Sequence, residues 1–343
     1  MQKKLKVGIA GYGVVGRRRA KHIKDRKDME IVGVCDRLFK NSHESLVDGI
    51  PSFSNYRDMF ASTSLDVVFV CVTNDIAPEI TISALNNGSH VFCEKPPGRN
   101  VDDIESVRVI EAQHPNLKLM YGFNHRYHDS VQDALKIVDS GEFGKIINLR
   151  GVYGKAKLIT FDQDDWRTKK EIAGGGVLLD QGIHMVDLMR LFAGEFTEVK
   201  SFISNKFWGY DVEDNAYALM RTSNGVVGML HSSATQWRHR FSLDVNLEKG
   251  TINLSGILSG SKSYGAESMT LVWANPDYDN GDPKEQTTRY NEDPSWESEI
   301  AIFSDAIINS KSIESSNSND ALLTMKLVHQ IYQSDSKWKN NTI

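Results

Sequence analysis

Residues 6–16 have the sequence KVGIAGYGVVG, in which an apolar run leads directly into a glycine-rich turn. The run Lys6–Ala10 has the apolar and β-branched residues of a buried strand, and the pattern after the turn favours a helix. A G-x-G-x-x-G pattern between a strand and a helix is typical of a dinucleotide-binding turn. We therefore predict a strand–turn–helix unit in which the helix N-terminus binds a pyrophosphate.

The glycines of this turn have separate roles. Gly11 permits the tight turn, Gly13 lets the backbone approach the pyrophosphate, and Gly16 allows the helix to pack closely. We expect the whole turn to contact the cofactor: Gly11, Tyr12, Gly13, Val14, Val15 and Gly16. The basic run Arg17–Arg19 that follows is interpreted as a solvated helix face.

An acidic residue ends the second predicted strand. Asp36 follows the apolar run Ile31–Cys35, where a carboxylate can bind the adenosine ribose diol. Its charge would repel a 2′-phosphate, which favours NAD as the cofactor. Arg37 stands beside it and could offset that repulsion, so NADP remains possible.

Short apolar runs alternate with helical segments through the first third of the chain. Such runs indicate strands that are buried on both faces, as in a doubly wound parallel sheet of the Rossmann type. The predicted strands are Lys6–Ala10, Ile31–Cys35, Asp66–Val72, His90–Cys93 and Leu117–Tyr121. The helices Pro78–Asn87 and Val101–Ala112 lie between them, the second with Asn100 as its N-cap.

The pattern changes after Gly122, and we predict two domains, residues 1–122 and 123–343. In the second, we expect the helices Asp129–Ser140, Val177–Phe192, Trp296–Asn309 and Ala321–Gln333 and a loop at Asn275–Pro294. Alternating apolar runs predict strands at Ile146–Tyr153, Val199–Phe207, Asn215–Thr222, Val226–Ser233, Phe241–Leu247 and Thr251–Leu254. Tight turns at 223–225 and 248–250 indicate hairpins. The expected fold is an α+β domain with a large, open, mostly antiparallel sheet.

The composition is that of a globular protein, and the net charge favours small-molecule chemistry over nucleic-acid binding. The 343 residues are 40% hydrophobic and 25% charged. The net charge of −5 gives no overall attraction to nucleic acid or anionic lipid. No apolar run approaches the roughly 20 residues that span a bilayer. The three cysteines, Cys35, Cys71 and Cys93, indicate neither a disulfide framework nor a metal site. We expect a cytoplasmic protein with no nucleic-acid partner, no membrane segment and no metal.

Two further segments carry residues suited to catalysis. Lys95 follows the strand His90–Cys93, at the carboxyl edge of the sheet where ligands bind, and could stabilise a developing alkoxide. Asp180 and His184 are four residues apart in a predicted helix, so both lie on one face and could act on one substrate hydroxyl. Taken singly, Lys95 could equally be an ordinary surface lysine. Asp180 and His184 could equally be an ordinary pair on the surface of a helix.

Together these motifs resemble the Gfo/Idh/MocA family, the glucose-fructose oxidoreductase and inositol dehydrogenase group, over essentially the whole chain. The Gly11–Gly16 turn, Glu94-Lys95-Pro96 and the D-x-G-x-H pattern of Asp180, Gly182 and His184 occur in the family's order and spacing. The resemblance implies that Lys95 and His184 line the catalytic pocket and that Asp180 holds substrate. It also implies cofactor contacts at Glu94 and Lys95.

Other family positions are matched less closely. Thr73 and Asn74 stand where a T-P-x-x-x-H pattern is frequent, and we assign them to the cofactor although the proline is absent. Asn124-His125-Arg126 resembles a family N-R-R/F stretch and implies that Arg126 contacts substrate. Asp165-Trp166-Arg167 resembles members that act on sugars, which implies a stacking ring at Trp166 and a bidentate donor at Arg167.

These observations predict an NAD(P)-dependent oxidoreductase that moves a hydride between nicotinamide and a secondary alcohol or ketone of a cyclitol, sugar or nucleotide sugar. His184 is the expected base, because histidine ordinarily titrates near neutrality. Two alternatives remain: a cofactor-binding sensor without turnover, and a redox-neutral NAD-dependent glycosidase or lyase. An uncovered sheet face would further predict a homodimer or homotetramer.

Overall fold

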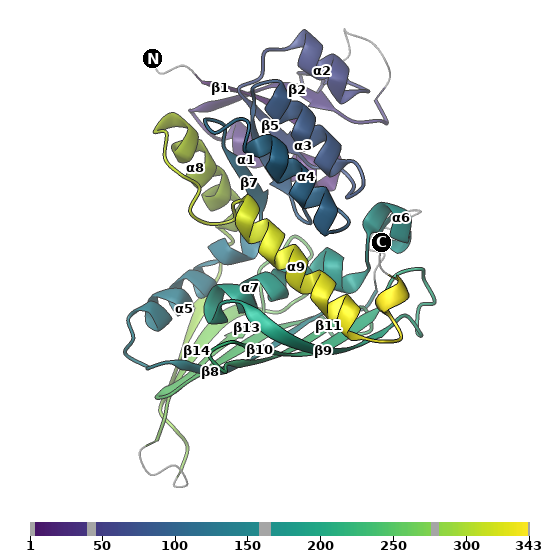
Figure 1. The fold of residues 1–343 in the computed structure, drawn as a ribbon. Helices are drawn as coiled ribbons and strands as arrows, with labels where there is room; N and C mark the ends of the chain where they lie inside the picture. The colour runs from purple at the N-terminus through teal and green to yellow at the C-terminus, as the bar shows by residue number, and fades with distance from the viewer. Residues whose placement is uncertain (1–3, 40–45, 158–165, 276–280, 342–343) are drawn as a thin grey trace. The chain divides into compact units, whose positions relative to one another are not determined.

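The computed structural model describes residues 4–39, 46–157, 166–275 and 281–341, shown in Figure 1. The contacts between Cα atoms divide the chain into two compact units. The first unit comprises residues 1–123 and 296–323, and the second comprises residues 124–295 and 324–343. The return of residues 296–323 to the first unit has no counterpart in the division at residue 122 that we drew from the sequence.

The described part of the first unit contains a seven-stranded sheet in the order β3-β4-β2-β1-β5-β6-β7. Its strands are β1 (Leu5–Ala10), β2 (Met29–Cys35), β3 (Leu46–Val47), β4 (Ile50–Phe53), β5 (Val67–Val70), β6 (His90–Glu94) and β7 (Leu119–Gly122). Its helices are α1 (Val14–Lys24), α2 (Tyr56–Ser62), α3 (Ala77–Asn86), α4 (Val101–Glu111) and α8 (Ser295–Ile308). All neighbouring strands are parallel except β3 and β4. The predicted doubly wound sheet is confirmed.

The sequence explains the central strands of this sheet, because they are apolar on both faces. All four residues of β5 are fully buried, as a central parallel strand covered by helices requires. The predicted helix cap is also present, since the Asn100 side chain accepts a hydrogen bond from the backbone N–H of Asp103 at the start of α4.

The described part of the second unit contains an eight-stranded sheet in the order β15-β14-β13-β12-β8-β11-β10-β9. Its strands are β8 (Ile146–Gly154), β9 (Phe196–Ser204), β10 (Asn215–Thr222), β11 (Val227–Ser233), β12 (Arg240–Leu247), β13 (Gly250–Ser255), β14 (Glu267–Trp273) and β15 (Glu285–Tyr290). All neighbours are antiparallel except β8 and β11, which confirms the predicted, mostly antiparallel sheet. The hairpins β10–β11 and β12–β13 form at the two predicted turns.

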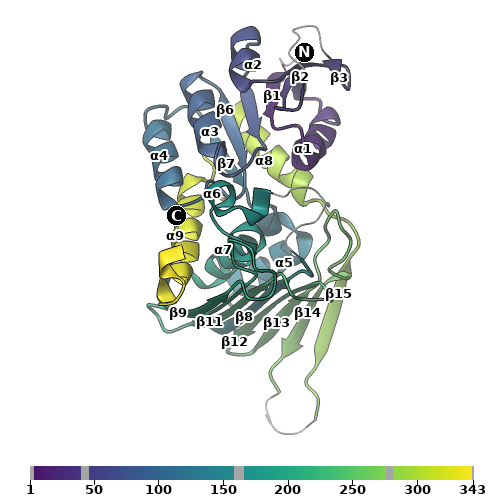
Figure 2. The same ribbon diagram turned by 90° about the vertical axis from the view of Figure 1, so that its right-hand side faces the viewer.

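Helices cover one face of this second sheet. They include α5 (Asp129–Asp139), α7 (Ile183–Ala193) and the long α9 (Ser318–Ser334). The short elements of this part of the chain are η1 (Asn124–Tyr127), η2 (Trp166–Thr168), α6 (Lys170–Ala173), η3 (Leu178–Gly182) and η4 (Lys339–Asn341). Figure 2 shows α5 and α7 over the same face of the sheet, and no helix of the described chain over the other.

One sequence-based expectation in the second unit was wrong. The predicted loop Asn275–Pro294 contains β15, a polar strand that pairs only with β14, and residues 276–280 of that loop lie outside the described residues. An edge strand needs no apolar face, so alternation gave no signal for it. The helix predicted at Val177–Phe192 is present, and it begins with the π-helical turn η3, a distortion that often marks functional sites.

The three cysteine thiols are free, and burial raises the pKa of Cys35 and of Cys93 to about 12. Among the helices that the structure describes, we find none that is both long and apolar enough to cross a membrane.

Candidate active site

The glycine turn of the first unit has the close contacts that its sequence predicts. A Cβ atom on Gly11, whose φ is +89°, would lie 2.3 Å from the Cys71 carbonyl oxygen. A Cβ on Gly16 would lie 1.9 Å from the Gly11 carbonyl oxygen, so both positions exclude any side chain. By contrast, a Cβ on Gly13 would have no heavy atom within 4 Å.

That open space lies at the N-terminus of α1. Gly13 is the N-cap residue, it makes no side-chain cap, and the first turn carries no acidic residue. Backbone N–H groups at such a helix end favour an anion. The turn therefore fits the pyrophosphate of a dinucleotide.

Asp36 lies beside this turn. Its Oδ2 accepts a hydrogen bond from the Tyr12 backbone N–H at 3.0 Å, and its Oδ1 accepts one from the Leu38 N–H at 3.0 Å. Both contacts fix the carboxylate at the end of β2, where it could reach a ribose diol. Arg37 is exposed next to it. Burial, together with a hydrogen bond to Asp48, raises the pKa of Tyr12 to about 12.

The other cofactor candidates follow neighbouring strands of the same sheet. Thr73 and Asn74 lie between β5 and α3, where the Thr73 hydroxyl donates to Asp75 at 2.6 Å and Asn74 is buried. Glu94 ends β6, and Lys95 follows it with a half-buried side chain. These positions lie at the carboxyl ends of parallel strands, the edge at which such sheets bind ligands.

The interpretation of Arg17–Arg19 as a solvated face was wrong for Arg19, which is fully buried. Its Nε donates to Glu94 at 2.7 Å and its Nη2 to Glu299 at 2.8 Å. The guanidinium also lies over the Trp296 ring, 4.2 Å from its centroid. Two carboxylates and an aromatic ring compensate the buried charge and fix the residue that precedes Lys95.

In the second unit, Asp180 lies in η3 between two cations. Lys155 Nζ lies 3.0 Å from Asp180 Oδ2, and Arg167 Nε lies 3.3 Å from Oδ1. The Arg167 guanidinium lies 4.7 Å from the centroid of the Trp166 ring. The structure thus brings Trp166, Arg167 and Asp180 together, whereas Asp165 lies outside the described residues.

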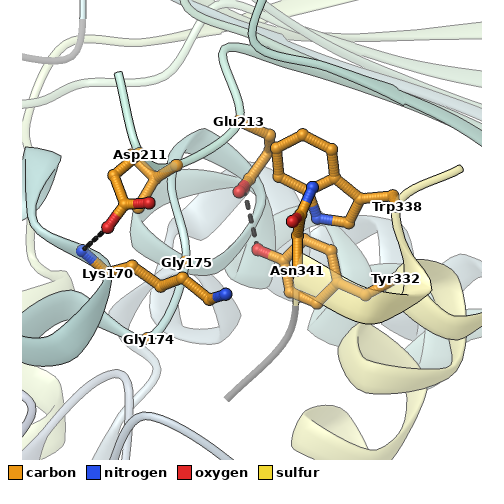
Figure 3. A pocket seen from close by; sticks show the side chains of 9 residues that line it. Lys170, Gly174, Gly175, Asp211, Glu213, Tyr332, Trp338 and Asn341 are labelled. Atoms are coloured by element: carbon orange, nitrogen blue, oxygen red, sulfur yellow. Dashed lines mark hydrogen bonds between the residues drawn. The ribbon is translucent and has the colours of Figure 1, made fainter.

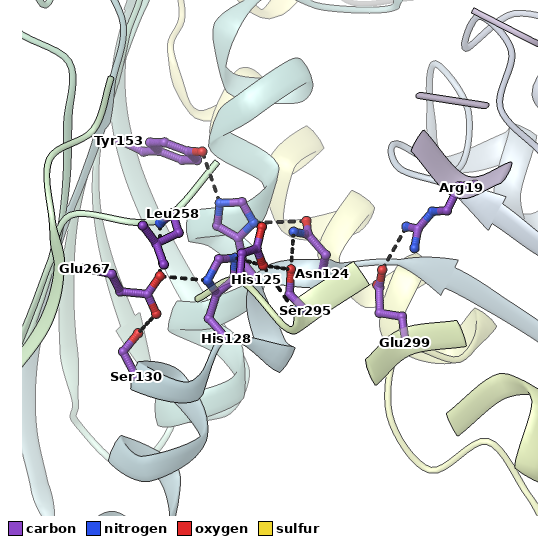
Figure 4. Close-up of polar contacts among 11 residues, drawn as sticks. Arg19, Asn124, His125, His128, Ser130, Tyr153, Leu258, Glu267, Ser295 and Glu299 are labelled. Atoms are coloured by element: carbon purple, nitrogen blue, oxygen red, sulfur yellow. Dashed lines mark hydrogen bonds and ion pairs between the residues drawn. The ribbon is translucent and has the colours of Figure 1, made fainter. Parts of the chain in front are cut away.

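His184 lies at the start of α7 and stacks on another imidazole. The rings of His184 and His125 have centroids 3.8 Å apart and are inclined by 16°. His125 contacts the Tyr153 hydroxyl at 3.0 Å through Nε2 and the Asn124 side-chain oxygen at 3.2 Å through Nδ1 (Figure 4). Two positive charges at this distance would repel, so the stack favours at most one protonated ring.

A third histidine, His128, lies against His125, with ring centroids 5.5 Å apart. His128 Nδ1 donates to Glu267 Oε2 at 2.9 Å, and both side chains are buried. Burial by itself would raise the pKa of Glu267, but hydrogen bonds from His128, from the Leu258 N–H and from Ser130 outweigh it, so the pKa lies below its usual range.

Arg126 lies in the interior of the second unit. Its Nε and Nη2 each donate to the Asp187 carboxylate at 2.7 Å, and its side chain is 4% exposed. The Thr324 hydroxyl donates to the same carboxylate at 2.9 Å. These contacts fasten η1 to α7, and a substrate contact of Arg126 stays a prediction.

Sequence reasoning missed three residues around Asp180. Lys155 is one. The others are Tyr153 and Tyr264, whose pKa values are raised by burial and by the nearby Asp180 charge, among other groups. A signal existed for Tyr153 and Lys155, because both lie where β8 ends. Tyr264 lies outside any helix or strand, and no local pattern predicts it.

Comparisons with known proteins match both parts of the chain to one family. Residues 5–123 match the model of the GFO/IDH/MocA oxidoreductase family with its NAD-binding Rossmann fold, and residues 131–253 match a GFO/IDH/MocA C-terminal domain. The D-glucoside 3-dehydrogenase of Escherichia coli is 30% identical over 274 residues, which cover 73% of this chain and 74% of that protein. The chain belongs to the Gfo/Idh/MocA family. It is therefore an NAD-binding oxidoreductase.

Further Gfo/Idh/MocA relatives are similar over different lengths. The inositol 2-dehydrogenase of Salmonella typhimurium is 26% identical over 277 residues, 78% of this chain and 79% of the relative. The levoglucosan dehydrogenase of Pseudarthrobacter phenanthrenivorans is 29% identical over 213 residues, and the match spans about half of its length, 53%. A solved levoglucosan dehydrogenase in complex with NADH has the same fold, with a TM-score of 0.82 at 21% identity over 98% of each chain.

Proposed function

We propose that this oxidoreductase is an NAD-preferring dehydrogenase that acts on a secondary carbinol of a sugar, a cyclitol or a nucleotide-linked sugar. The observation that carries the proposal is the pairing of Asp180 with Lys155 and Arg167 on the segment that also holds His184. Such a cluster of charged donors and acceptors suits a polyhydroxylated ring. The names of the relatives, which include glucoside, inositol and levoglucosan dehydrogenases, support the same substrate class.

We assign the chemistry to three residues. When bound, NAD accepts or returns the hydride. His184 takes the hydroxyl proton on a ring nitrogen, and the Lys95 ammonium donates a hydrogen bond to the same oxygen. Asp180 binds a neighbouring hydroxyl or orients the imidazole. The stacked ring of His125 supports this assignment, because it restricts the orientation of His184.

Substrate binding is assigned mainly to Arg167 and Trp166. The guanidinium over the indole offers a fixed donor fork beside an aromatic face, which suits hydroxyl pairs or phosphate oxygens. Arg126 takes second place in this assignment, because its guanidinium already holds Asp187.

The cofactor preference is assigned to Asp36, with Gly11–Gly16, Arg37, Thr73, Asn74 and Glu94 as the other residues around NAD. The hydrogen bond between the Tyr12 N–H and Asp36 supports this assignment, because it holds a negative charge beside the glycine turn. A 2′-phosphate at that place would be repelled.

We also propose that the chain forms a homodimer or homotetramer through the uncovered face of its second sheet. Phe202, Leu219 and Met229 are 78%, 52% and 48% exposed on adjacent strands, and Leu219 lies directly opposite Met229. An apolar patch of this kind is typical of an interface, and a second copy can present the same patch.

We also propose a cytoplasmic location. The free cysteines support it, because free thiols fit a reducing compartment.

The test is a screen of cyclitols, free sugars, glycosides and nucleotide sugars with NAD⁺, followed through the near-ultraviolet absorbance of reduced nicotinamide. We expect net reduction with at least one compound, and its loss in His184→Ala. NADH binding without net reduction by any compound, and without conversion of any glycoside, would indicate a sensor. Conversion of a glycoside without net reduction would indicate a redox-neutral lyase.

A further inference from the structure

The segment that carries Asp180 begins without a local cap. The first N–H groups of a helix have no partner within it, and no side chain near Val177 caps η3. Glu213, far along the sequence, supplies the missing acceptors. Its Oε2 accepts from the Gly176 N–H at 2.7 Å, its Oε1 from the Leu178 N–H at 2.9 Å, and its main-chain oxygen from the Val177 N–H at 3.1 Å.

This contact is close and buried. Glu213 is 1% exposed, and a Cβ on Gly176 would lie 2.0 Å from its main-chain oxygen. The Tyr332 hydroxyl of α9 donates to Oε1 at 2.8 Å (Figure 3). A small pocket beside them is also lined by Lys170, Asp211, Trp338 and Asn341. One buried carboxylate therefore satisfies two backbone donors and one hydroxyl.

The contact leads directly to Asp180. The Asp180 N–H donates to the Gly176 carbonyl at 2.8 Å. Gly176, whose own N–H is bound by Glu213, is therefore part of the helical turn that ends at Asp180. His184 follows one turn later in α7. A carboxylate at this end also complements the helix dipole.

We propose that Glu213 is a positioning residue for Asp180 and His184, acting through the backbone of Gly176 and Leu178. The inference rests on the function proposed above for Asp180 and His184. Displacements of about 1 Å at a catalytic group can cost on the order of a hundredfold in rate. Glu213 thus contributes to turnover although it touches neither substrate nor cofactor.

The first test compares Glu213→Gln with Tyr332→Phe. The glutamine keeps the shape but presents an NH₂ group to one of the two N–H donors, whereas the phenylalanine removes one hydroxyl and leaves both backbone contacts. With the best compound of the substrate screen, well below each variant's Tm, we expect kcat to fall about 10- to 100-fold in Glu213→Gln and less than about twofold in Tyr332→Phe. NADH affinity should stay at the wild-type value in both.

The pH dependence separates positioning from a merely structural role. Burial raises the pKa of Glu213, although its hydrogen bonds oppose the shift. Below that pKa the wild-type carboxyl is neutral and resembles the glutamine, so the ratio of wild-type to Glu213→Gln kcat should shrink as pH falls. The charged and titratable groups around it are Tyr332 of α9, Lys170 of α6 and Asp211.

Hydrogen exchange adds a readout that needs no substrate. In the NADH-bound protein, amides 176–180 should exchange faster in Glu213→Gln than in wild type, and little faster in Tyr332→Phe. If Glu213→Gln does not fold, Gly176→Ala serves instead, because its Cβ displaces the turn from the Glu213 carbonyl.

Two outcomes would overturn the inference: wild-type kcat in the Glu213 variant, or a kcat ratio that does not change with pH, while His184→Ala still abolishes turnover. Unchanged turnover in His184→Ala would instead refute the proposed function.

Discussion

The structure and the family resemblance predict different roles for Arg126, and a substitution can distinguish them. Family resemblance implies a substrate contact, whereas the structure shows a bidentate ion pair with Asp187 in which the two side chains are 4% and 1% exposed. In Arg126→Met, the Asp187 carboxylate stays buried with the Thr324 hydroxyl as a remaining donor. Removing one partner of a buried pair costs about 3–5 kcal/mol, because the other charge is left uncompensated.

This cost can be measured as a change in Tm. For a domain of this size, 1 kcal/mol corresponds to about 2–4 °C, so we expect the transition of the second unit to fall by roughly 6–20 °C in a calorimetric scan. The Thr324 hydroxyl favours the lower half of that range. The double variant Arg126→Met/Asp187→Leu should recover most of the loss, since two apolar side chains replace the pair.

The opposite pattern would refute this reasoning. If Arg126→Met kept the wild-type Tm and mainly raised KM for substrate, Arg126 would be a substrate ligand, as the resemblance implies. The matched variant Arg167→Ala gives the comparison, because we expect it to raise KM and leave Tm nearly unchanged.

Three further predictions follow from the same contacts. Asp36→Ala should lower kcat/KM with NAD⁺ several-fold and improve it with NADP⁺; a wild type that already prefers NADP⁺ would contradict the assignment. The folded-state pKa of Glu267 lies below the unfolded value of about 4.3, so its stabilisation is complete above that pH and is lost as pH falls through the folded pKa. Urea titrations should show that the free energy of unfolding falls with pH in wild type and falls less in Glu267→Gln. An equal dependence of this free energy on pH in both proteins would contradict the prediction. Leu219→Glu should convert the assembly to monomers in light scattering, and a wild type that is monomeric at micromolar concentration would exclude the interface.

The sequence predicted what depends on local pattern. The parallel strands β1, β2, β5, β6 and β7 follow apolar runs, and the β10–β11 and β12–β13 turns carry glycine where the chain reverses, so these were found. The strands β3 and β4 of the first sheet were not predicted, because β3 has two residues and β4 contains Pro51 and Ser52. The edge strand β15 was missed because its polar residues lack an apolar face. Arg19 was misjudged because a run of arginines gives no sign that Glu94 and Glu299 will surround one of them.

The same limit applies to the candidate site. Asp180 and His184 stand out through their spacing, but the contacts that hold them join residues far apart in sequence. Lys155 approaches Asp180 across 25 positions, and Glu213 approaches Gly176 across 37. Such pairs form only when strands and helices pack together in the folded chain, so no local sequence pattern predicts them.

The most direct test of the central claim is the kcat of His184→Ala relative to wild type, measured by NAD⁺ reduction with the best substrate of the screen, across pH. We predict a loss of about 10² to 10⁴ with NADH binding retained, because removing a positioned base costs that much. Lys95→Ala should lose a similar amount. Near wild-type kcat and an unchanged pH profile in His184→Ala, with turnover abolished in Lys95→Ala, would contradict the account and assign the base to Lys95.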